Sequence, residues 1–244
     1  MRYAPALAAT IFALLLWQII VSITGLPKFI LPSPVLVAEA WWQNRAVIAE
    51  HTLVTAMEVL IGLAVGAGLG VVTAIQLALS KAARVLVQPL LVFTQALPVF
   101  ALAPILTLWL GYGLWSKVAM AVLIIYFPVT SAFFDGLMRT PQGYLDLART
   151  MQANPWRILW RIHVPAALPS LASGLRLAAV YAPIGAVIGE WVGASRGLGY
   201  LMLLANGRAK TDLMFAAMLT LGVFSVLLHL AVGYLTRNLG KDSR

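Results

Sequence analysis

Residues 135–169 read DGLMRTPQGYLDLARTMQANPWRILWRIHVPAALP, the longest polar interruption in a sequence that otherwise consists of apolar runs. The stretch contains two helix-start signals, Thr140-Pro141 and Asn154-Pro155. In each, a capping side chain precedes a proline, and a proline at the first helical position loses no hydrogen bond. We therefore predict two short helices joined by a turn at a membrane surface. A membrane protein with one structured polar loop of this kind is expected to contact another protein through it.

The composition around this loop is that of a membrane protein. Of the 244 residues, 61% are hydrophobic and only 10% are charged, whereas soluble globular domains are much less apolar. The net charge of +9 would suggest nucleic-acid binding in a soluble protein. Here the basic residues lie between apolar runs, so they are better explained as loop charges that set membrane orientation. We expect membrane lipid as the surrounding medium and no nucleic-acid partner.

Six apolar segments are long enough to cross a bilayer, because a span needs about 20 mainly apolar residues. They are approximately residues 6–24, 53–79, 89–110, 117–134, 171–192 and 213–236. We predict an all-α, polytopic membrane protein in which residues 1–244 form a single transmembrane domain. The first segment is interpreted as a span, because its apolar run is longer than a typical signal-peptide core.

The basic residues also predict an orientation. If the N-terminus is inside, the inner segments hold ten Lys and Arg residues and the outer segments hold six, with Lys117 counted among the outer ones. The inner segments are then residues 1–5, 80–88, 135–170 and 237–244. Because cytoplasmic loops carry an excess of Lys and Arg, both termini and the polar loop are expected in the cytoplasm.

Small residues and prolines mark the second and third predicted spans. Gly62, Gly66 and Gly70 form a ladder that permits close helix approach, which we interpret as packing within the chain rather than as a dimer face. Pro98 and Pro104 fall in the third span, where proline frees backbone carbonyls and kinks a helix. Both prolines are therefore candidates for lining a translocation path.

Four ionisable side chains fall inside the predicted spans, namely Glu58, Arg176, Glu190 and His229. Burying such groups costs several kcal/mol unless they are paired, so each needs a role. Glu58 and Arg176 lie near span ends, where they can reach water, and His229 is expected to hydrogen-bond to a neighbouring helix. Glu190 lies toward the outer mouth, where a place on the substrate path and a structural ion pair both remain open.

The sequence carries little sign of catalytic or metal chemistry. It lacks cysteine and a Walker-type phosphate loop, and its histidines have no carboxylate at metal-ligand spacing. His51 and His163 are expected to be solvated loop residues. We predict that the chain is not an enzyme, has no catalytic or metal-binding residues, and relies on another chain if transport is powered by ATP. Few carboxylates lie within the spans, which argues against the alternative of a self-contained secondary transporter.

The loop contains DLA at 146–148, then three intervening residues and Gln152, then nine intervening residues and IHVP at 162–165. This resembles the E-A-A, three residues, G, nine residues, I-x-L-P signature of permease subunits of bacterial ABC importers, the binding-protein-dependent inner-membrane components. The spacing is intact, but Asp146 replaces Glu, Leu147 replaces Ala and Gln152 replaces Gly. The last position suits a backbone with positive φ, and the neighbouring Asn154-Pro155 is an alternative source of the turn.

In the family that the loop resembles, its short helices dock in a groove of the ATPase subunit and transmit the closure of that subunit. The resemblance assigns this coupling to Asp146, Leu147, Ala148, Met151, Gln152, Ala153, Ile162 and Pro165. Leu145, Ala148 and Met151 share one helical face and Leu147 lies four residues before Met151, which predicts an apolar surface.

The same resemblance implies the rest of the assembly. It implies a type I ABC importer permease fold with six transmembrane helices, a homodimer of this chain, two copies of an ATP-binding subunit and an extracytoplasmic substrate-binding protein. The location would be the bacterial inner membrane. The chain would need no cofactor of its own, because the partner subunit uses the ATP.

Further motifs point to a substrate class. LPSP at 31–34, WLGYG at 109–113 and GLGYL at 197–201 look like nitrate, sulfonate and taurine importers. Within that group, FDGL at 134–137, APIGAVIGEW at 182–191 and TDLMF at 211–215 are similar to permeases for hydroxymethylpyrimidine-type thiamine precursors. The resemblance thus implies uptake of a pyrimidine thiamine precursor, with taurine, an alkylsulfonate or nitrate as the alternative.

Overall fold

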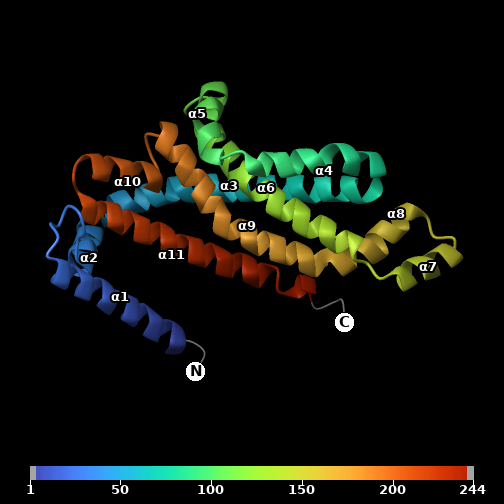
Figure 1. Cartoon of the computed structure of the whole chain (residues 1–244), viewed down its shortest axis with the longest axis horizontal. Helices are drawn as coiled ribbons and strands as arrows, with labels where there is room; N and C mark the ends of the chain where they lie inside the picture. The colour runs from blue at the N-terminus through green and yellow to red at the C-terminus, as the bar shows by residue number, and fades with distance from the viewer. Residues whose placement is uncertain (1–3, 241–244) are drawn as a thin grey trace. The chain divides into compact units, whose positions relative to one another are not determined.

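The structure, a computed structural model, describes residues 4–240, and this part of the chain contains helices and no strand (Figure 1). The all-α prediction is confirmed. The helices are α1 (Ala4–Thr24), α2 (Pro34–Gln43), α3 (Arg45–Leu79), α4 (Lys81–Ala96), α5 (Val99–Leu110), α6 (Leu114–Met138), α7 (Gln142–Thr150), α8 (Pro155–Ile158), α9 (Val164–Gly193), α10 (Leu198–Gly207) and α11 (Thr211–Leu235). A π-helical turn, Leu159–His163, joins α8 to α9, and a short 3-10 helix, Asn238–Gly240, follows α11.

Within residues 4–240, four helical stretches are long and apolar enough to cross a membrane. They are α3, α6, the stretch Pro155–Gly193 and α11, while α4 and α5 would add a fifth crossing only if taken together. The predicted third span, residues 89–110, is therefore not one continuous helix, because α4 and α5 meet at an angle of 102°. The break falls before Pro98, which lacks an amide hydrogen and disfavours helical geometry in the residue before it. The described residues therefore contain four or five candidate spans, compared with the six that the sequence predicts.

The helices group into two compact units. Unit 1 combines the residues up to Thr55 with Ser195–Val223, and unit 2 combines Ala56–Ala194 with the residues from Phe224 onward.

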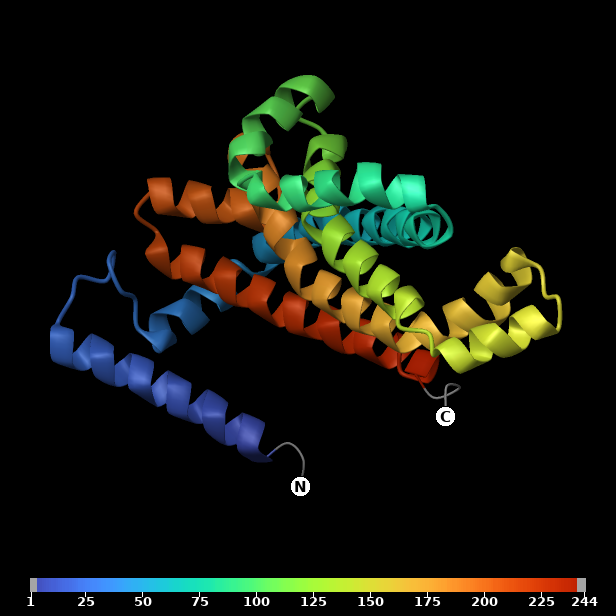
Figure 2. The ribbon, with the colours of Figure 1, turned by 45° about the vertical axis from the view of Figure 1, so that its right-hand side comes forward.

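In unit 2, α6 packs closely against α3 on one side and α9 on another. A Cβ atom on Gly62 of α3 would lie 2.6 Å from the Cβ of Ala121, and one on Gly66 would lie 2.6 Å from Cγ1 of Ile125. These distances are shorter than any carbon–carbon contact, so only glycine permits this approach. The interpretation of the glycine ladder as packing within the chain is confirmed. Figures 1 and 2 show α6 and α9 running side by side.

Gly62→Ala is expected to lower the free energy of unfolding by about 1–3 kcal/mol, because the added methyl meets Ala121 Cβ, which cannot rotate away. Gly68 on the same helix is the matched control, since no heavy atom of the described chain lies within 4 Å of a Cβ built there. Gly68→Ala should raise stability by about 0.5–1 kcal/mol through helix propensity. Thermal unfolding in detergent compares the two variants, and equal melting temperatures would contradict the close packing.

In unit 1, His51 and Thr55 near the start of α3 satisfy the first amides of α10. The Gly197 N–H donates to His51 Nδ1 at 2.9 Å, and the Leu198 N–H donates to Thr55 Oγ1 at 2.8 Å. Helix N-termini leave amides without partners inside the helix, and these two side chains supply acceptors. The prediction that His51 is a solvated loop residue is therefore wrong.

Candidate functional site

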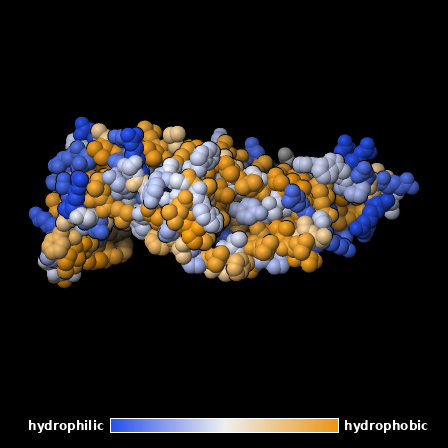
Figure 3. Space-filling view, turned by 90° about the horizontal axis from the view of Figure 1, so that it is seen from above, coloured by the Kyte–Doolittle hydropathy of each residue, from blue (hydrophilic) through white to orange (hydrophobic). Residues whose placement is uncertain are grey.

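The polar loop folds into a helical hairpin beyond the ends of α6 and α9, formed by α7, α8 and the turn between them (Figures 1 and 2). Hydrophilic residues gather over it in Figure 3, in contrast to the hydrophobic middle of that view. The second predicted start signal is confirmed, since Asn154 Oδ1 accepts the Trp156 N–H at 2.9 Å and Pro155 opens α8. At the first signal, Pro141 precedes α7 and the Thr140 hydroxyl instead donates to Leu137 O at 3.0 Å.

The turn after α7 depends on Gln152, whose φ is +56°. The Gln152 N–H donates to Arg149 O at 2.9 Å and the Ala153 N–H to Ala148 O at 3.0 Å. This pair of bonds is a Schellman motif, in which the left-handed residue is usually glycine. Positive φ thus falls at the position where the resembled signature has glycine, and Asn154 begins the next helix instead of making the turn.

Gln152→Gly is expected to raise the free energy of unfolding of the hairpin by up to about 1 kcal/mol, because it removes the strain of a side chain in the left-handed region. Gln142→Gly, at the first residue of α7, is the matched control, and should lower it by less than about 1 kcal/mol through lost helix propensity. Hydrogen exchange of the hairpin amides measures both effects. Faster exchange in Gln152→Gly than in the natural chain would contradict this geometry.

The apolar residues of α7 divide between two faces. Leu145 and Ala148 are 8% and 6% exposed, whereas Leu147 and Met151 are 59% and 73% exposed. The predicted single face of Leu145, Ala148 and Met151 is therefore wrong, because the first two pack inward and Met151 faces outward. Tyr144, which is 62% exposed, precedes Leu147 by three residues. We call Tyr144, Leu147 and Met151 the outer face of the hairpin.

Other predicted coupling residues occupy varied environments. Asp146 and Arg149 form a 3.0 Å ion pair with side chains 65% and 67% exposed, and an exposed pair of this kind adds little stability. Ala153 and Ile162 are half-buried, and Pro165 is exposed at the start of α9.

His163 fastens the hairpin to α6, a role that sequence reasoning missed. Its Nδ1 lies 2.9 Å from both Leu137 O and Thr140 Oγ1, at the C-terminal end of α6. The prediction that His163 is a solvated loop residue is wrong. His163 follows the hairpin in sequence, whereas Leu137 and Thr140 precede it. The contact therefore holds the two ends of the hairpin together.

A buried ionisable cluster lies near the other end of α6. Glu58 of α3, Lys117 of α6 and Glu190 of α9 are 4%, 2% and 1% exposed. The side chains of Glu58 and Glu190 share a hydrogen bond, and Lys117 lies within electrostatic reach of Glu58. The expectation that Glu58 reaches water is wrong, and Lys117, counted among the outer loop charges, is a core residue. For Glu190 the structure shows a place in this structural cluster.

Beside the acidic pair, Lys117 binds backbone carbonyls. Its Nζ donates to the carbonyls of Tyr112 and Gly113, the latter at 3.0 Å, and to that of Gly193 at 3.1 Å. Tyr112 and Gly113 lie in the turn between α5 and α6, while Gly193 ends α9. One ammonium group therefore joins two separate segments of unit 2.

The remaining predicted residues do not gather into one site. Pro98, directly before α5, and Pro104, within it, are exposed, whereas Glu190 is buried among helices. Their role in a translocation path stays a prediction. His229 behaves as expected, because its Nδ1 lies 3.2 Å from Arg176 O on a neighbouring helix. Arg176 Nε in turn donates to Thr236 Oγ1 at 3.2 Å.

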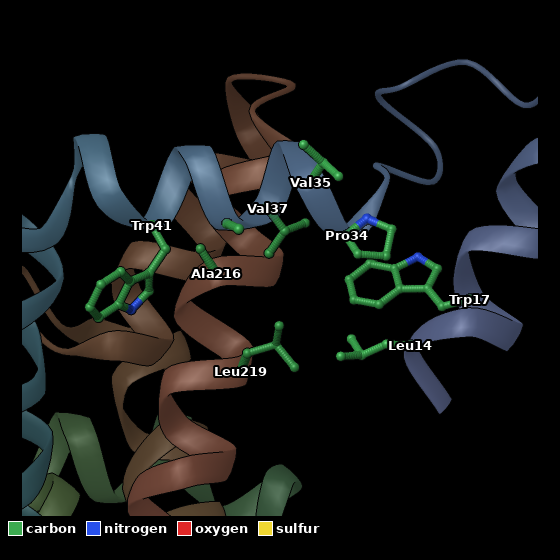
Figure 4. A pocket seen from close by; sticks show the side chains of 9 residues that line it. Leu14, Trp17, Pro34, Val35, Val37, Trp41, Ala216 and Leu219 are labelled. Atoms are coloured by element: carbon green, nitrogen blue, oxygen red, sulfur yellow. The ribbon is translucent and has the colours of Figure 1, made fainter. Parts of the chain in front are cut away.

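Unit 1 also contains a pocket of about 460 Å³ between α1, α2 and α11 (Figure 4). In Figure 4, Leu14 and Trp17 of α1 face Leu219 of α11, with Pro34 above them. This apolar and aromatic lining suits lipid acyl chains better than a charged solute. Within the part of the chain that the structure describes, no group of three or more His, Asp or Glu residues could hold a metal ion.

Comparison with known proteins gives consistent matches over most of the chain. Residues 66–243 match the family described as "Binding-protein-dependent transport system inner membrane component". A probable ABC transporter permease protein of Haemophilus influenzae is 49% identical over 91% of this chain and 91% of its own length. The formylaminopyrimidine transport permease protein ThiX of Halalkalibacterium halodurans is 38% identical over 93% of this chain and 92% of its own.

Two further similarities concern a second transport protein and the fold. The riboflavin transport system permease protein RibX of Chloroflexus aurantiacus is 36% identical over 96% of this chain and 89% of its own. Among solved structures, a chain of the inward-facing MetNI methionine ABC transporter matches with a TM-score of 0.64, covering 81% of this chain and 96% of that chain. At 18% sequence identity, this last match establishes the fold alone.

Proposed function

The chain belongs to the family of binding-protein-dependent transport system inner membrane components, and on this premise we propose that its α7–α8 hairpin docks on the ATP-binding partner and that it imports a pyrimidine precursor of thiamine. The resemblance to ABC importer permeases is confirmed, as is the type I importer fold. The protein is a multi-pass inner-membrane transport subunit and not an enzyme. A separate ATP-binding subunit uses the ATP, and a substrate-binding protein delivers the solute.

The observation that carries the docking proposal is the outer face of the hairpin. Tyr144, Leu147 and Met151 are all more than half exposed on a segment whose surroundings are polar. An exposed apolar patch rimmed by polar residues marks a protein-binding surface. Spacing of three and four residues along α7 suits a helix laid into an apolar groove.

The hairpin can pass force to the membrane helices because it is tied to them. The His163 ring reaches the end of α6, and Leu159 packs with Phe133 and Leu137 of α6 in one buried cluster. A displacement of the hairpin by a closing partner would therefore move α6 and α9. We place the hairpin and both termini in the cytoplasm, following the excess of basic residues there.

We also propose a homodimer with two ATP-binding subunits. Each chain contributes one α7–α8 hairpin, so two chains present two docking surfaces. Tighter binding of the partner to one conformation would then shift the population toward it, which is the physical basis of alternating access.

A photo-crosslinking experiment tests the docking surface. The natural chain has no cysteine, so Leu147→Cys provides a single thiol for a short photoreactive label. In membranes containing the assembled complex, we expect this label to capture the ATP-binding subunit. Trp115→Cys, at a 63% exposed position near the other end of α6, is the control and should not capture it. Capture from position 115 but not from 147 would contradict the docking assignment.

For the substrate, the support is chemical. The relatives ThiX and RibX are described as permeases for formylaminopyrimidine and riboflavin, which are both nitrogen heterocycles. The alternative substrates, taurine, alkylsulfonates and nitrate, carry an anionic group that would favour a basic side chain on the path. Lys117, the basic residue of the buried cluster, instead directs its ammonium to three backbone carbonyls.

Calorimetric titration of the partner substrate-binding protein tests the substrate. Hydroxymethylpyrimidine, formylaminopyrimidine, taurine, an alkylsulfonate and nitrate would be titrated separately. We expect selective binding of a pyrimidine. Preference for a sulfonate or nitrate would overturn the substrate proposal and leave the docking proposal standing.

A further inference from the structure

The cluster of Glu58, Lys117 and Glu190 is unfavourable in free energy for a protein interior. Burying ionised groups carries a desolvation penalty that apolar residues of similar size would avoid. Here three ionisable side chains, contributed by three different helices, are each at most 4% exposed. A cluster of this kind therefore calls for a role other than packing.

The bonds of Lys117 indicate what that role is. An ammonium group has three N–H donors, and here they serve the carbonyls of Tyr112, Gly113 and Gly193. The turn between α5 and α6 is thereby held against the end of α9. The fit is close, since a Cβ atom on Gly193 would lie 2.7 Å from Cδ1 of Tyr112 and 2.9 Å from Cγ2 of Thr107.

The acidic residues of the cluster have fewer hydrogen-bond partners than Lys117. Glu58 Oε2 is buried and has no hydrogen-bond partner among the described residues, although Glu58 shares a hydrogen bond with Glu190. A buried acceptor without a partner raises the free energy of the conformation that contains it. A conformation that admits water to Glu58 would remove this penalty.

The cluster and the hairpin lie at opposite ends of the same helix. Lys117 is in the first turn of α6 and the hairpin follows Met138, a separation of about 30 Å at the helical rise of about 1.5 Å per residue. If the hairpin is cytoplasmic, as in the proposed function on which this step rests, the cluster lies on the outer side. Substrate delivered by a binding protein enters from that side.

From this geometry we infer that Lys117, buried beside Glu58 and Glu190, is a positioning residue that closes the outer mouth of the permease. Its ammonium joins the α5–α6 turn to the end of α9 while the path faces inward, and releases them when the hairpin is driven by the ATP-binding partner. The three side chains thus determine the free-energy difference between the states with the outer mouth closed and open, and the ATP-binding partner shifts the populations of these two states.

The test uses the assembled complex, with ATP-binding subunit and binding protein, in proteoliposomes. Thr107 is 4% exposed and lies against Gly193 at the end of α9. A thiol in Thr107→Cys therefore reports opening of the outer mouth through its rate of labelling by a membrane-impermeant maleimide added outside. Without ATP, Lys117→Met is expected to raise that rate roughly tenfold, because of the three bonds of Lys117 only the one to Gly193 reaches α9 and its loss as a bond to a charged group has about that effect. Resting ATPase activity should rise and its stimulation by loaded binding protein should fall.

Two further variants, each made in the Thr107→Cys parent, separate positioning from folding. Lys28→Met, at an exposed lysine, makes the same charge change and should label like the parent. Because Glu58 and Glu190 can share a hydrogen bond only if one of them holds a proton, Lys117→Met leaves one buried negative charge. In Lys117→Met/Glu58→Gln/Glu190→Gln that charge is removed, so folding should recover if Lys117→Met folds poorly, while the reporter thiol should still label fast. Slow resting labelling with intact stimulation in that triple variant would overturn the inference. Absence of ATP-dependent transport by the parent complex would instead overturn the proposed function.

Discussion

Replacing Met151 by aspartate is expected to abolish stimulation of the partner's ATPase activity by loaded binding protein, while leaving membrane insertion intact. Met151 is 73% exposed on the hairpin's outer face and lies outside the spans, so the change should not disturb folding. In a docked complex the new carboxylate would be buried without a partner. That costs roughly 3–5 kcal/mol, which would weaken docking by at least about a hundredfold.

The matched control is Met151→Leu, which keeps the side chain apolar and should retain most of the stimulation. Both variants would be reconstituted with the ATP-binding subunit, and ATP hydrolysis would be measured with and without loaded binding protein. Normal stimulation of ATP hydrolysis by loaded binding protein in Met151→Asp would contradict the docking assignment. Equal loss in both variants would show that the site depends on the shape of methionine rather than on its polarity.

The second large effect is expected at Gly185 of α9. A Cβ atom there would lie 2.6 Å from Cα and 3.0 Å from N of Ala121, and 3.1 Å from Met120 O. These are backbone atoms of α6, so no side-chain rotation can relieve the contact. Gly185→Ala should therefore separate α6 from α9 and lower the free energy of unfolding by about 3 kcal/mol or more.

Gly222→Ala in α11 is the comparison for this variant, because the described chain places no heavy atom within 4 Å of a Cβ at Gly222. The measurement is the yield of monodisperse protein in detergent together with its melting temperature. Gly222→Ala should give the natural yield and an equal or slightly higher melting temperature, because alanine has the better helix propensity. A Gly185→Ala protein with natural yield and melting temperature would contradict the close α6–α9 packing.

The hairpin could be predicted from sequence because its signals are local. Asn154-Pro155 starts a helix through a side-chain cap and a proline, and both act within a few residues. Positive φ at Gln152 followed from motif spacing. The split of α7 into two faces could not be predicted, because Leu145 and Met151 are both apolar and only the surrounding helices decide which one is covered.

The position of the break before Pro98 could be predicted from the sequence, but its angle could not. Proline indicates where a helix cannot continue unchanged, and the structure breaks there. The 102° angle between α4 and α5 is larger than a simple kink, so the presence of a proline alone does not predict it. Hydropathy, which sees only length and apolar content, therefore predicted one continuous span where the structure has two helices.

The buried cluster was missed because its members lie near the ends of apolar segments. Position along a span does not reveal whether a side chain faces water or another helix. A usable signal was present in the neighbouring glycines: Gly62 follows Glu58 by one helical turn, and Gly189 directly precedes Glu190. Close helix approach at those glycines brings the acidic residues to α6, where Lys117 meets them.

The most direct test of the account is uptake of a labelled pyrimidine thiamine precursor by proteoliposomes that contain this chain. We predict uptake only when the ATP-binding subunit, ATP on its side of the membrane and the loaded binding protein on the other are all present. Uptake should stop when Met151→Asp replaces the natural chain. Uptake by the chain alone, driven by a proton or sodium gradient, would contradict the account and identify a self-contained secondary transporter.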